Sequence, residues 1–371
     1  MMYMLYMEHD WLLYLAAFAC AFAIALATTP FAKKVAFRLG AVQAPRARDM
    51  HKKPMPRMGG IAIVIGFIAT TAIMTIFIPY FRTLEFAGFA AGAIIIAITG
   101  AVDDVRELKS TTKLIVQIIV AVIVVAVGIR IEIVMWPITA YLQVFSIPIT
   151  IFWVIGMTNA VNLIDGLDGL AAGVSAIGAL CLMVLCILSG SPLAVVLSAT
   201  LAGSCLGFLP RNFNPAEVFM GDAGALFIGY VLAVSSIMGV FKGYTLLAIL
   251  VVFFALCLPI FDTIFAVIRR IYKTRKLSSW KDADRGHMHH RLIDAGFGQK
   301  QSVILMYGLS TVTAIIAIVI AMQHIEAIIV TVIFVLALIM MLYVYSKRTR
   351  ERKEGPPEDQ NKKASPCQGE A

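Results

Sequence analysis

The sequence predicts an all-α, polytopic integral membrane protein with about eleven transmembrane helices. Of its 371 residues, 60% are hydrophobic and only 14% are charged, whereas soluble domains carry about a quarter charged residues. The apolar residues form blocks long enough to cross a bilayer as helices, which takes about 20 residues. The blocks lack the period-two alternation of a membrane β-barrel. These observations favour helical spans over a soluble core or a barrel.

The candidate spans divide the chain into one membrane domain, 1–346, and a polar tail, 347–371, which we expect to be disordered. The spans are 11–29, 59–78, 84–101, 112–128, 147–161, 169–188, 192–209, 223–241, 244–266, 303–322 and 325–345. The first follows Glu8 and Asp10 rather than a basic leading region, which indicates a retained span and not a cleaved signal peptide.

The basic residues predict the orientation of these spans. If the loop at 30–58 is cytoplasmic, all but three of the 31 Lys and Arg residues fall on the cytoplasmic side, the exceptions being Arg82, Arg130 and Lys242. The positive-inside rule then places the N-terminus outside and the C-terminus in the cytoplasm. The net charge of +9 therefore reflects topology and attraction to anionic lipid, and we expect no nucleic-acid partner.

Acidic residues at membrane depth are candidates for function because their burial is costly. Asp103 and Asp104 end the third span, where an adjacent pair suits a cation site or supplies one carboxylate as a base. A solvated helix end is the alternative for this pair. Asp222 begins the eighth span after Asn212 and Phe219, an aromatic and amide composition typical of a nucleobase pocket, although Asp222 would also serve as a helix cap.

A second acidic segment places Asn159, Asn162, Asp165 and Asp168 at every third position. Such residues share one helix face. Amide and carboxylate oxygens converging where glycines break a helix suit Mg²⁺ and its phosphate ligands. A helix cap would account for one aspartate but not for four polar residues in register.

The basic groups on the same predicted face suggest phosphate binding. They comprise Lys52 and Lys53 before the second span, and Arg285, His287, His289, His290 and Arg291. The histidines lack a cysteine partner, which disfavours structural zinc, and the flanking arginines favour phosphate over a transition metal. Contact with lipid headgroups is the alternative. Carboxylates for a metal beside cations for phosphates predict phosphoryl transfer with a lipid substrate. A secondary transporter is disfavoured, because its carboxylates would lie near the midplane.

Five motifs then occur in order: H-K-K-P-M-P-R-M-G-G, D-D-V-R-E, N-A-V-N-L-I-D-G-L-D-G-L, F-M-G-D-A-G and H-M-H-H-R-L. Together they resemble the polyprenyl-phosphate N-acetylhexosamine-1-phosphate transferases, up to about residue 345. The histidine motif is most similar to the undecaprenyl-phosphate N-acetylglucosamine-1-phosphate transferase branch, which begins teichoic acid and O-antigen synthesis.

The resemblance implies a reaction at the cytoplasmic face of a bacterial inner membrane. Undecaprenyl phosphate would attack the β-phosphorus of UDP-N-acetylglucosamine and release UMP, with Mg²⁺, or Mn²⁺ in its place, as cofactor. Phospho-MurNAc-pentapeptide translocase and a transferase for another UDP-N-acetylhexosamine are the alternatives within the family. A homodimer is also implied.

By motif match, Asp168 and Asp222 would hold the metal. Asp103 and Asp104 would lie beside the lipid phosphate, with Asp165 supporting the metal site, so the catalytic set is Asp103, Asp104, Asp165 and Asp168. The substrate-binding set is Lys52, Lys53, Asn159, Asn162, Asn212, Phe219, Arg285, His287, His289, His290 and Arg291, with Phe219 stacking on uracil. The family's acidic motif often ends in Asp where this chain has Glu107, to which no ligand role is assigned.

Overall fold

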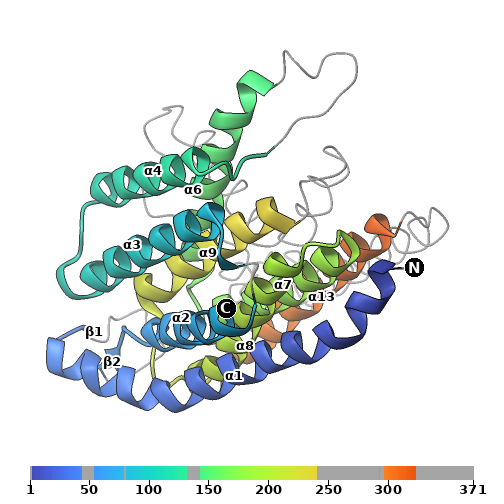
Figure 1. Ribbon diagram of the computed structural model, residues 1–371. Helices are drawn as coiled ribbons and strands as arrows, with labels where there is room; N and C mark the ends of the chain where they lie inside the picture. The colour runs from blue at the N-terminus through green and yellow to red at the C-terminus, as the bar shows by residue number, and fades with distance from the viewer. Residues whose placement is uncertain are drawn as a thin grey trace, which may run out of the picture.

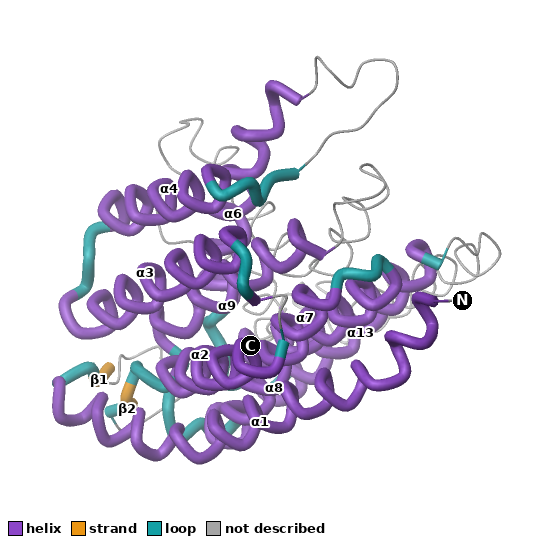
Figure 2. Tube along the Cα trace, in the orientation of Figure 1, coloured by secondary structure: helices purple, strands orange, loops and turns teal. Residues whose placement is uncertain are grey.

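The computed structural model describes residues 2–43, 54–78, 81–131, 143–239, 292 and 296–322. Within them the chain is almost entirely helical, with one two-stranded antiparallel sheet (Figures 1 and 2). The helices are α1 (Met2–Leu39), α2 (Gly60–Phe77), α3 (Leu84–Arg106), α4 (Ser110–Ala126), α6 (Ser146–Ile164), α7 (Leu170–Leu188), α8 (Pro192–Asn212), α9 (Gly221–Gly239) and α13 (Gln299–Ala321). A 3₁₀ turn, η2 (Gln143–Phe145), precedes α6, and β1 (Val42–Gln43) pairs with β2 (Met55–Pro56).

Each predicted span that falls within the described residues is a helix. Eight of these helices are long and apolar enough to cross a membrane, and α4, with 17 residues, is a shorter apolar helix. The chain is thus a mostly helical protein with several candidate spans. The spans at 244–266 and 325–345 and the tail at 347–371 lie outside the described residues, so the total of eleven remains a prediction.

The predicted boundary between the first span and its loop is wrong. The helix does not stop at 29 but continues through Pro30 to Leu39, so the loop begins at Gly40. One missing proline N–H is tolerated within a long apolar helix. Similarly, α3, α6 and α8 continue past their apolar blocks. These extensions carry polar residues such as Asp103, Asp104 and Asn162 on regular helix.

Helix α9 is the centre of the bundle. Every residue of α9 is buried except Asp222, because α2, α3, α6, α7 and α8 all pack against it. Tyr230 fixes the contact with α3, since its hydroxyl donates to the Phe89 carbonyl at 2.9 Å and the two rings stack with centroids 5.8 Å apart. Helices α1 and α13 lie outside this core, against α8 and α7 respectively.

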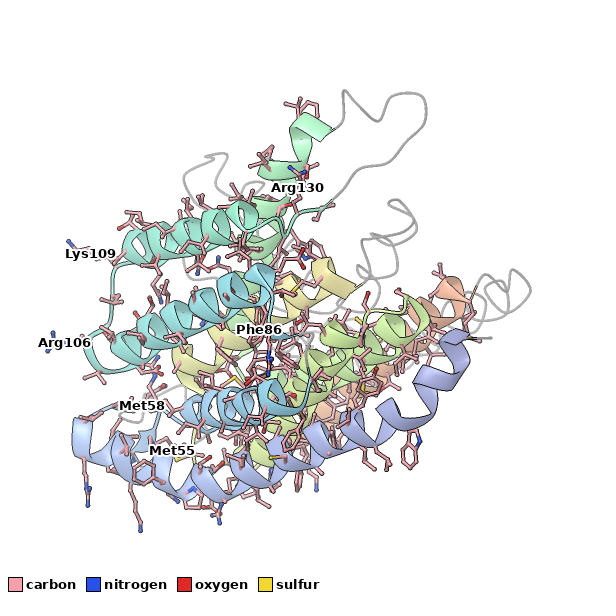
Figure 3. All side chains as sticks on the ribbon, viewed as in Figure 1. Met55, Met58, Phe86, Arg106, Lys109 and Arg130 are labelled. Carbon is pink, nitrogen blue, oxygen red and sulfur yellow. The ribbon has the colours of Figure 1, made fainter. Side chains whose placement is uncertain are left out.

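One end of the bundle collects the polar motifs. From α1 to α9 the described helices alternate in direction, and α13 begins at the same end as α9. The ends of α1, α3, α6 and α8 and the starts of α2, α4, α7, α9 and α13 therefore lie together (Figure 1). Arg106 and Lys109 mark this end, and Arg130 marks the other (Figure 3). Among the described basic residues only Arg82 and Arg130 lie at the opposite end.

We expect Gly203→Ala to destabilise the protein although alanine favours helix formation. A Cβ at Gly203 in α8 would collide with the backbone carbonyl of Phe18 in α1, so the two helices would have to separate. The cost of such overpacking is about 1–3 kcal/mol. Gly156→Ala in α6 is the matched control, because nothing lies within 4 Å of its added methyl group.

Thermal unfolding of the detergent-purified proteins, followed by size-exclusion chromatography, measures the difference. Gly156→Ala should melt at or slightly above the wild-type temperature, since alanine exceeds glycine in helix propensity by up to about 1 kcal/mol. Equal melting temperatures for the two variants would contradict close packing of α1 on α8.

Candidate active site

The backbones of two motifs pair directly at the polar end of the bundle. Phe219 N–H donates to the Pro56 carbonyl at 2.8 Å, and Gly59 N–H returns a bond to the Phe219 carbonyl at 2.9 Å. Gly60 N–H then donates to the Met220 carbonyl at 2.7 Å. This pairing continues from β2 and carries the chain of 213–220 to the start of α9, where Gly221 adopts a positive φ of 72°.

Asp104 caps the start of α9 from the neighbouring helix. Its Oδ1 accepts the Asp222 N–H at 2.8 Å, and its Oδ2 accepts the Ala223 N–H at 3.1 Å. The carboxylate thereby satisfies two N–H groups that a helix start leaves unpaired, and it sits at the positive end of the helix dipole. Asp104 is buried, at 5% exposure, so both of its oxygens are committed to this cap.

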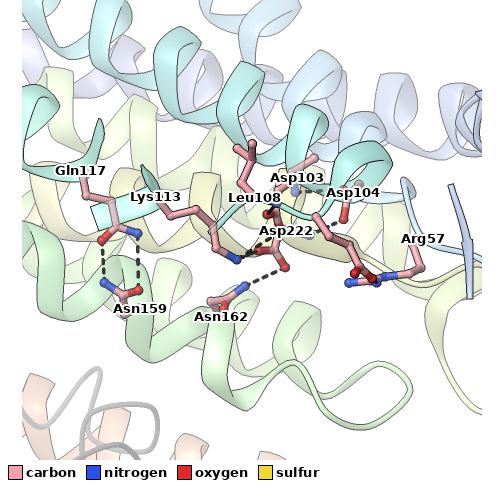
Figure 4. A network of polar contacts seen from close by, with 11 residues as sticks. Arg57, Asp103, Asp104, Leu108, Lys113, Gln117, Asn159, Asn162 and Asp222 are labelled. Carbon is pink, nitrogen blue, oxygen red and sulfur yellow. Dashed lines mark hydrogen bonds and ion pairs between the residues drawn. The ribbon is translucent and has the colours of Figure 1, made fainter. Parts of the chain in front are cut away.

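Asp103 and Asp222 share a cation, the ammonium group of Lys113 (Figure 4). Lys113 Nζ lies 2.7 Å from Asp222 Oδ2 and 3.1 Å from Asp103 Oδ2. Asn162 donates through Nδ2 to Asp222 Oδ1 at 3.1 Å, and the Leu108 N–H donates to Asp103 Oδ1 at 2.7 Å. Four helices, α3, α4, α6 and α9, meet in this cluster.

The residues of this cluster fit a magnesium ion. An ammonium group already bridges the carboxylates of Asp103 and Asp222, so their geometry accepts a positive charge between them. Within the described parts of the chain no group of three or more His, Cys, Asp or Glu side chains could enclose a metal. The pair of carboxylates itself suits Mg²⁺, which is usually held by one or two carboxylates and completes its shell with water and substrate phosphates.

A reciprocal amide pair fastens α4 to α6 one turn from Lys113. Asn159 Nδ2 donates to Gln117 Oε1 at 2.6 Å and to its own helix's Ile155 carbonyl at 2.8 Å, and Gln117 Nε2 donates back to Asn159 Oδ1 at 3.4 Å (Figure 4). The amides of Asn159 and Gln117 therefore satisfy each other. Asn159, predicted to bind substrate, is engaged here in helix packing.

The loop between α6 and α7 joins the loop between α8 and α9 through Asp168. The Asp168 Oδ2 accepts the Asn214 Nδ2–H and the Ala216 N–H, each at 3.1 Å. Asn214 Nδ2 also donates to Gln299 Oε1 at 2.8 Å, which adds the start of α13 to the network. Direct coordination of a metal by Asp168 stays a prediction, since the residue that shares a cation with Asp222 is Asp103.

Gly169 also links the start of α7 to the end of α8 and to α13. Its N–H donates to Asn212 Oδ1 at 3.1 Å, and its carbonyl accepts the Tyr307 hydroxyl at 2.6 Å. The Asn212 amide donates in turn to the Val218 carbonyl at 2.9 Å. Asn212 is buried and satisfied by backbone, so it shapes the loop that carries Phe219, a half-buried ring beside α2.

Within the described residues the carboxylate of Asp165 has no hydrogen-bond partner, although its backbone N–H donates to the Asn162 carbonyl at 3.4 Å. The carboxylate lies within electrostatic range of Asp222 and Asp168. Asp165 is half-buried, and its carboxylate is closely surrounded by protein atoms. That desolvation, with a smaller contribution from the charge of Asp222, raises the pKa of Asp165 to about 7, and Arg57 opposes the shift. A further positive charge beside Asp165 would favour its ionised form.

Several predicted site residues lie outside the described residues. They are Lys52, Lys53, Arg285, His287, His289, His290 and Arg291. Their predicted contacts with phosphates or sugar remain predictions. Glu107, the residue that replaces the usual third aspartate, is exposed, and its Oε1 lies 3.9 Å from Arg57 Nη1.

Comparison with known proteins identifies the family. A family model described as glycosyl transferase family 4 matches residues 86–240, the stretch from α3 to the end of α9. A Bacillus subtilis protein named probable undecaprenyl-phosphate N-acetylglucosaminyl 1-phosphate transferase is 39% identical over 306 residues, which cover 82% of this chain and 84% of the relative. The chain belongs to the polyprenyl-phosphate N-acetylhexosamine-1-phosphate transferase family.

Other relatives extend the comparison. A Mycolicibacterium smegmatis decaprenyl-phosphate N-acetylglucosaminephosphotransferase is 36% identical over 312 residues, 75% of each chain. A Staphylococcus epidermidis phospho-N-acetylmuramoyl-pentapeptide-transferase is 30% identical over 305 residues, 77% of this chain and 91% of the relative. The resemblance predicted from the five motifs is thereby confirmed, and the chain is a glycosyl-1-phosphate transferase.

The sequence did not reveal every residue of this transferase's cluster. From the sequence alone, Lys113 is only one of the basic residues on the predicted cytoplasmic side, although it lies at the centre of the network. Its one signal was its place in the fourth predicted span, where an ammonium group is costly unless it has a partner. Gln117, four residues later on the same helix face, gave the same signal. No local pattern marked Gln299 or Tyr307, which reach the site from a distant helix.

We expect Asp104 to support the stability of the protein and the adjacent Asp103 to support its transfer activity. Asp104→Asn should lower the melting temperature, because its amide would place an NH₂ group against a buried N–H of α9 at a cost of about 1–3 kcal/mol. Asp103→Asn should melt near the wild type, since a carboxamide oxygen still accepts the Leu108 N–H and repulsion from Asp222 is relieved. Asp103→Asn should nevertheless lose most transfer activity. Melting in detergent and transfer assays on both variants test this, and equal melting losses would contradict the assigned difference.

Proposed function

We propose that this chain transfers N-acetylglucosamine 1-phosphate from UDP-N-acetylglucosamine to undecaprenyl phosphate with the help of Mg²⁺. The observation that carries the proposal is the cation site between Asp103 and Asp222, at the end of a bundle of candidate membrane spans. Such a site beside the bilayer suits a reaction between a lipid phosphate and a nucleoside diphosphate sugar. The names of the B. subtilis and M. smegmatis relatives support N-acetylglucosamine as the sugar.

In the proposed reaction an oxygen of the lipid phosphate forms a bond to the β-phosphorus of the donor. The bond between that phosphorus and the bridging oxygen breaks, and UMP leaves with the bridging oxygen. A divalent cation bound there would neutralise charge on the diphosphate oxygens. Asp103 and Asp222 would hold this cation, Asn162 fixes the carboxylate of Asp222, and Asp165 would add negative charge beside them. Asp104 supports the site through α9 instead of touching substrate.

A phosphate nucleophile needs no base at neutral pH, because its second pKa is near 6. Positioning and charge neutralisation then supply most of the rate. Phe219 is proposed to stack on the uracil, as its half-buried ring lies on the loop held by Asn212 and Asp168. The predicted roles of Lys52, Lys53 and the segment with His287, His289 and His290 are part of the same proposal.

The polar end of the bundle is proposed to face the cytoplasm of a bacterial cell. Support comes from the described basic residues, which lie at this end except for Arg82 and Arg130, as the positive-inside rule requires of a cytoplasmic face. The implied homodimer stays an expectation, to be tested by the mass of the detergent-solubilised protein.

Release of UMP from the purified full-length protein tests the reaction. With undecaprenyl phosphate and Mg²⁺, we expect release from UDP-N-acetylglucosamine, loss of release in EDTA, and recovery with Mg²⁺ or Mn²⁺. Asp222→Asn should lower the rate at least about a hundredfold, because a metal site contributes several kcal/mol to charge stabilisation. Glu107→Gln is the matched control: it neutralises an exposed carboxylate outside the cluster and should keep the wild-type rate.

Donor specificity is measured in the same assay. Release from UDP-MurNAc-pentapeptide or UDP-N-acetylgalactosamine, and not from UDP-N-acetylglucosamine, would keep the mechanism but assign a different sugar, as the more distant S. epidermidis relative would suggest. No release from any donor by folded protein would overturn the proposed function.

A further inference from the structure

The ammonium group of Lys113 lies where the proposed function requires a metal ion. This group lies 2.7 Å and 3.1 Å from oxygens of Asp222 and Asp103, the two carboxylates proposed to bind Mg²⁺. A lysine cannot keep both contacts while a divalent cation takes the space between the same oxygens. The ammonium group and the metal must therefore compete for one site.

A cation between the two carboxylates offsets their mutual repulsion. Their side chains are only 7% and 13% exposed, so water screens their mutual repulsion poorly. Lys113 supplies a positive charge to both, and its own side chain is 23% exposed, which leaves it a path toward solvent. Without metal, Lys113 is what makes the close approach of Asp103 and Asp222 tolerable.

The backbone of α4 is held in place by a contact that does not involve the side chain of Lys113. Gln117, one turn further along α4, is 2% exposed and is bonded reciprocally to Asn159 of α6. This pair holds the helix in register, while Lys113 lies in the first turn on a flexible four-carbon stem. The ammonium group can leave the carboxylates by rotation of its own bonds, with no movement of α4.

We propose that Lys113 is an exchangeable counter-ion of the metal site: it holds Asp103 and Asp222 together before the metal arrives and is displaced when the metal binds. The displaced ammonium group then lies within reach of the same end of the bundle, free to pair with a phosphate oxygen of the substrates. The inference rests on the proposed metal site, and it predicts opposite effects of one substitution on metal affinity and on transfer.

The experiment is a titration of the full-length protein in detergent with Mn²⁺ alone, followed by electron paramagnetic resonance of the free ion. Binding that Asp222→Asn abolishes defines the site. We expect Lys113→Met to bind Mn²⁺ at least about tenfold more tightly than wild type, because an adjacent cation shifts the proton affinity of a carboxylate by about 1–3 pKa units and opposes a metal in the same way. Transfer at saturating Mn²⁺ should fall at least about tenfold.

Lys109→Met is the matched control. It removes the same charge from an exposed position at the start of the same helix, so its Mn²⁺ affinity should stay within about twofold of wild type, since solvent screens that charge. If Lys113→Met folds poorly without metal, Lys113→Arg serves instead: its permanent charge and paired donors should weaken Mn²⁺ binding.

The outcomes separate the exchange from the metal site. Wild-type Mn²⁺ binding that is abolished in Asp222→Asn but unchanged or weaker in Lys113→Met would overturn the exchange and leave the site intact. No binding by the wild type would overturn both. Undiminished transfer by Lys113→Met at saturating Mn²⁺ would overturn the contact of the displaced ammonium group with phosphate.

Discussion

The cap that Asp104 places on α9 is the contact from which the rest of the site is built. α9 is buried along its whole length apart from Asp222, so its first N–H groups would be left unpaired without a partner from another helix. Asp104 supplies both missing acceptors. Since Asp222 is the first residue bonded in this way, the cap also determines where its carboxylate lies relative to Asp103, the residue directly before Asp104 in α3.

The capped helix start has an electrostatic consequence. It gathers Asp103, Asp104, Asp165 and Asp222 at one end of the bundle, where like charges repel and burial penalises ionisation. The chain offsets this with Lys113, with the Asn162 amide and with Arg57 near Asp165. A cluster that needs added positive charge to remain compact is well suited to bind a divalent ion and the phosphates that accompany it.

The loops around this cluster are held by side chains that hydrogen-bond to one another and to the backbone. Asp168 and Asn212 lock the loop of 213–220 to the start of α7, and Gln299 and Tyr307 fix both to α13. A phosphotransferase gains from such rigidity because its catalysis depends on position more than on covalent chemistry. Residues of one motif thus divide into those that face the cation, such as Asn162, and those that hold the loops in place, such as Asp168.

Within the described residues, the sequence by itself determined the helical spans and the shared end of the polar motifs, and it also determined the family. Apolar blocks, charge asymmetry and short motifs are local properties of the chain. The sequence also predicted Asp103, Asp104, Asp165 and Asp168 as catalytic residues and Asp168 and Asp222 as metal ligands. Only the tertiary structure decided which of these faces a cation: Asp104 caps a helix and Asp168 secures a loop, while Asp103 and Asp222 share Lys113. The reason is that a carboxylate's role depends on its partners, and those partners come from helices far away in the sequence.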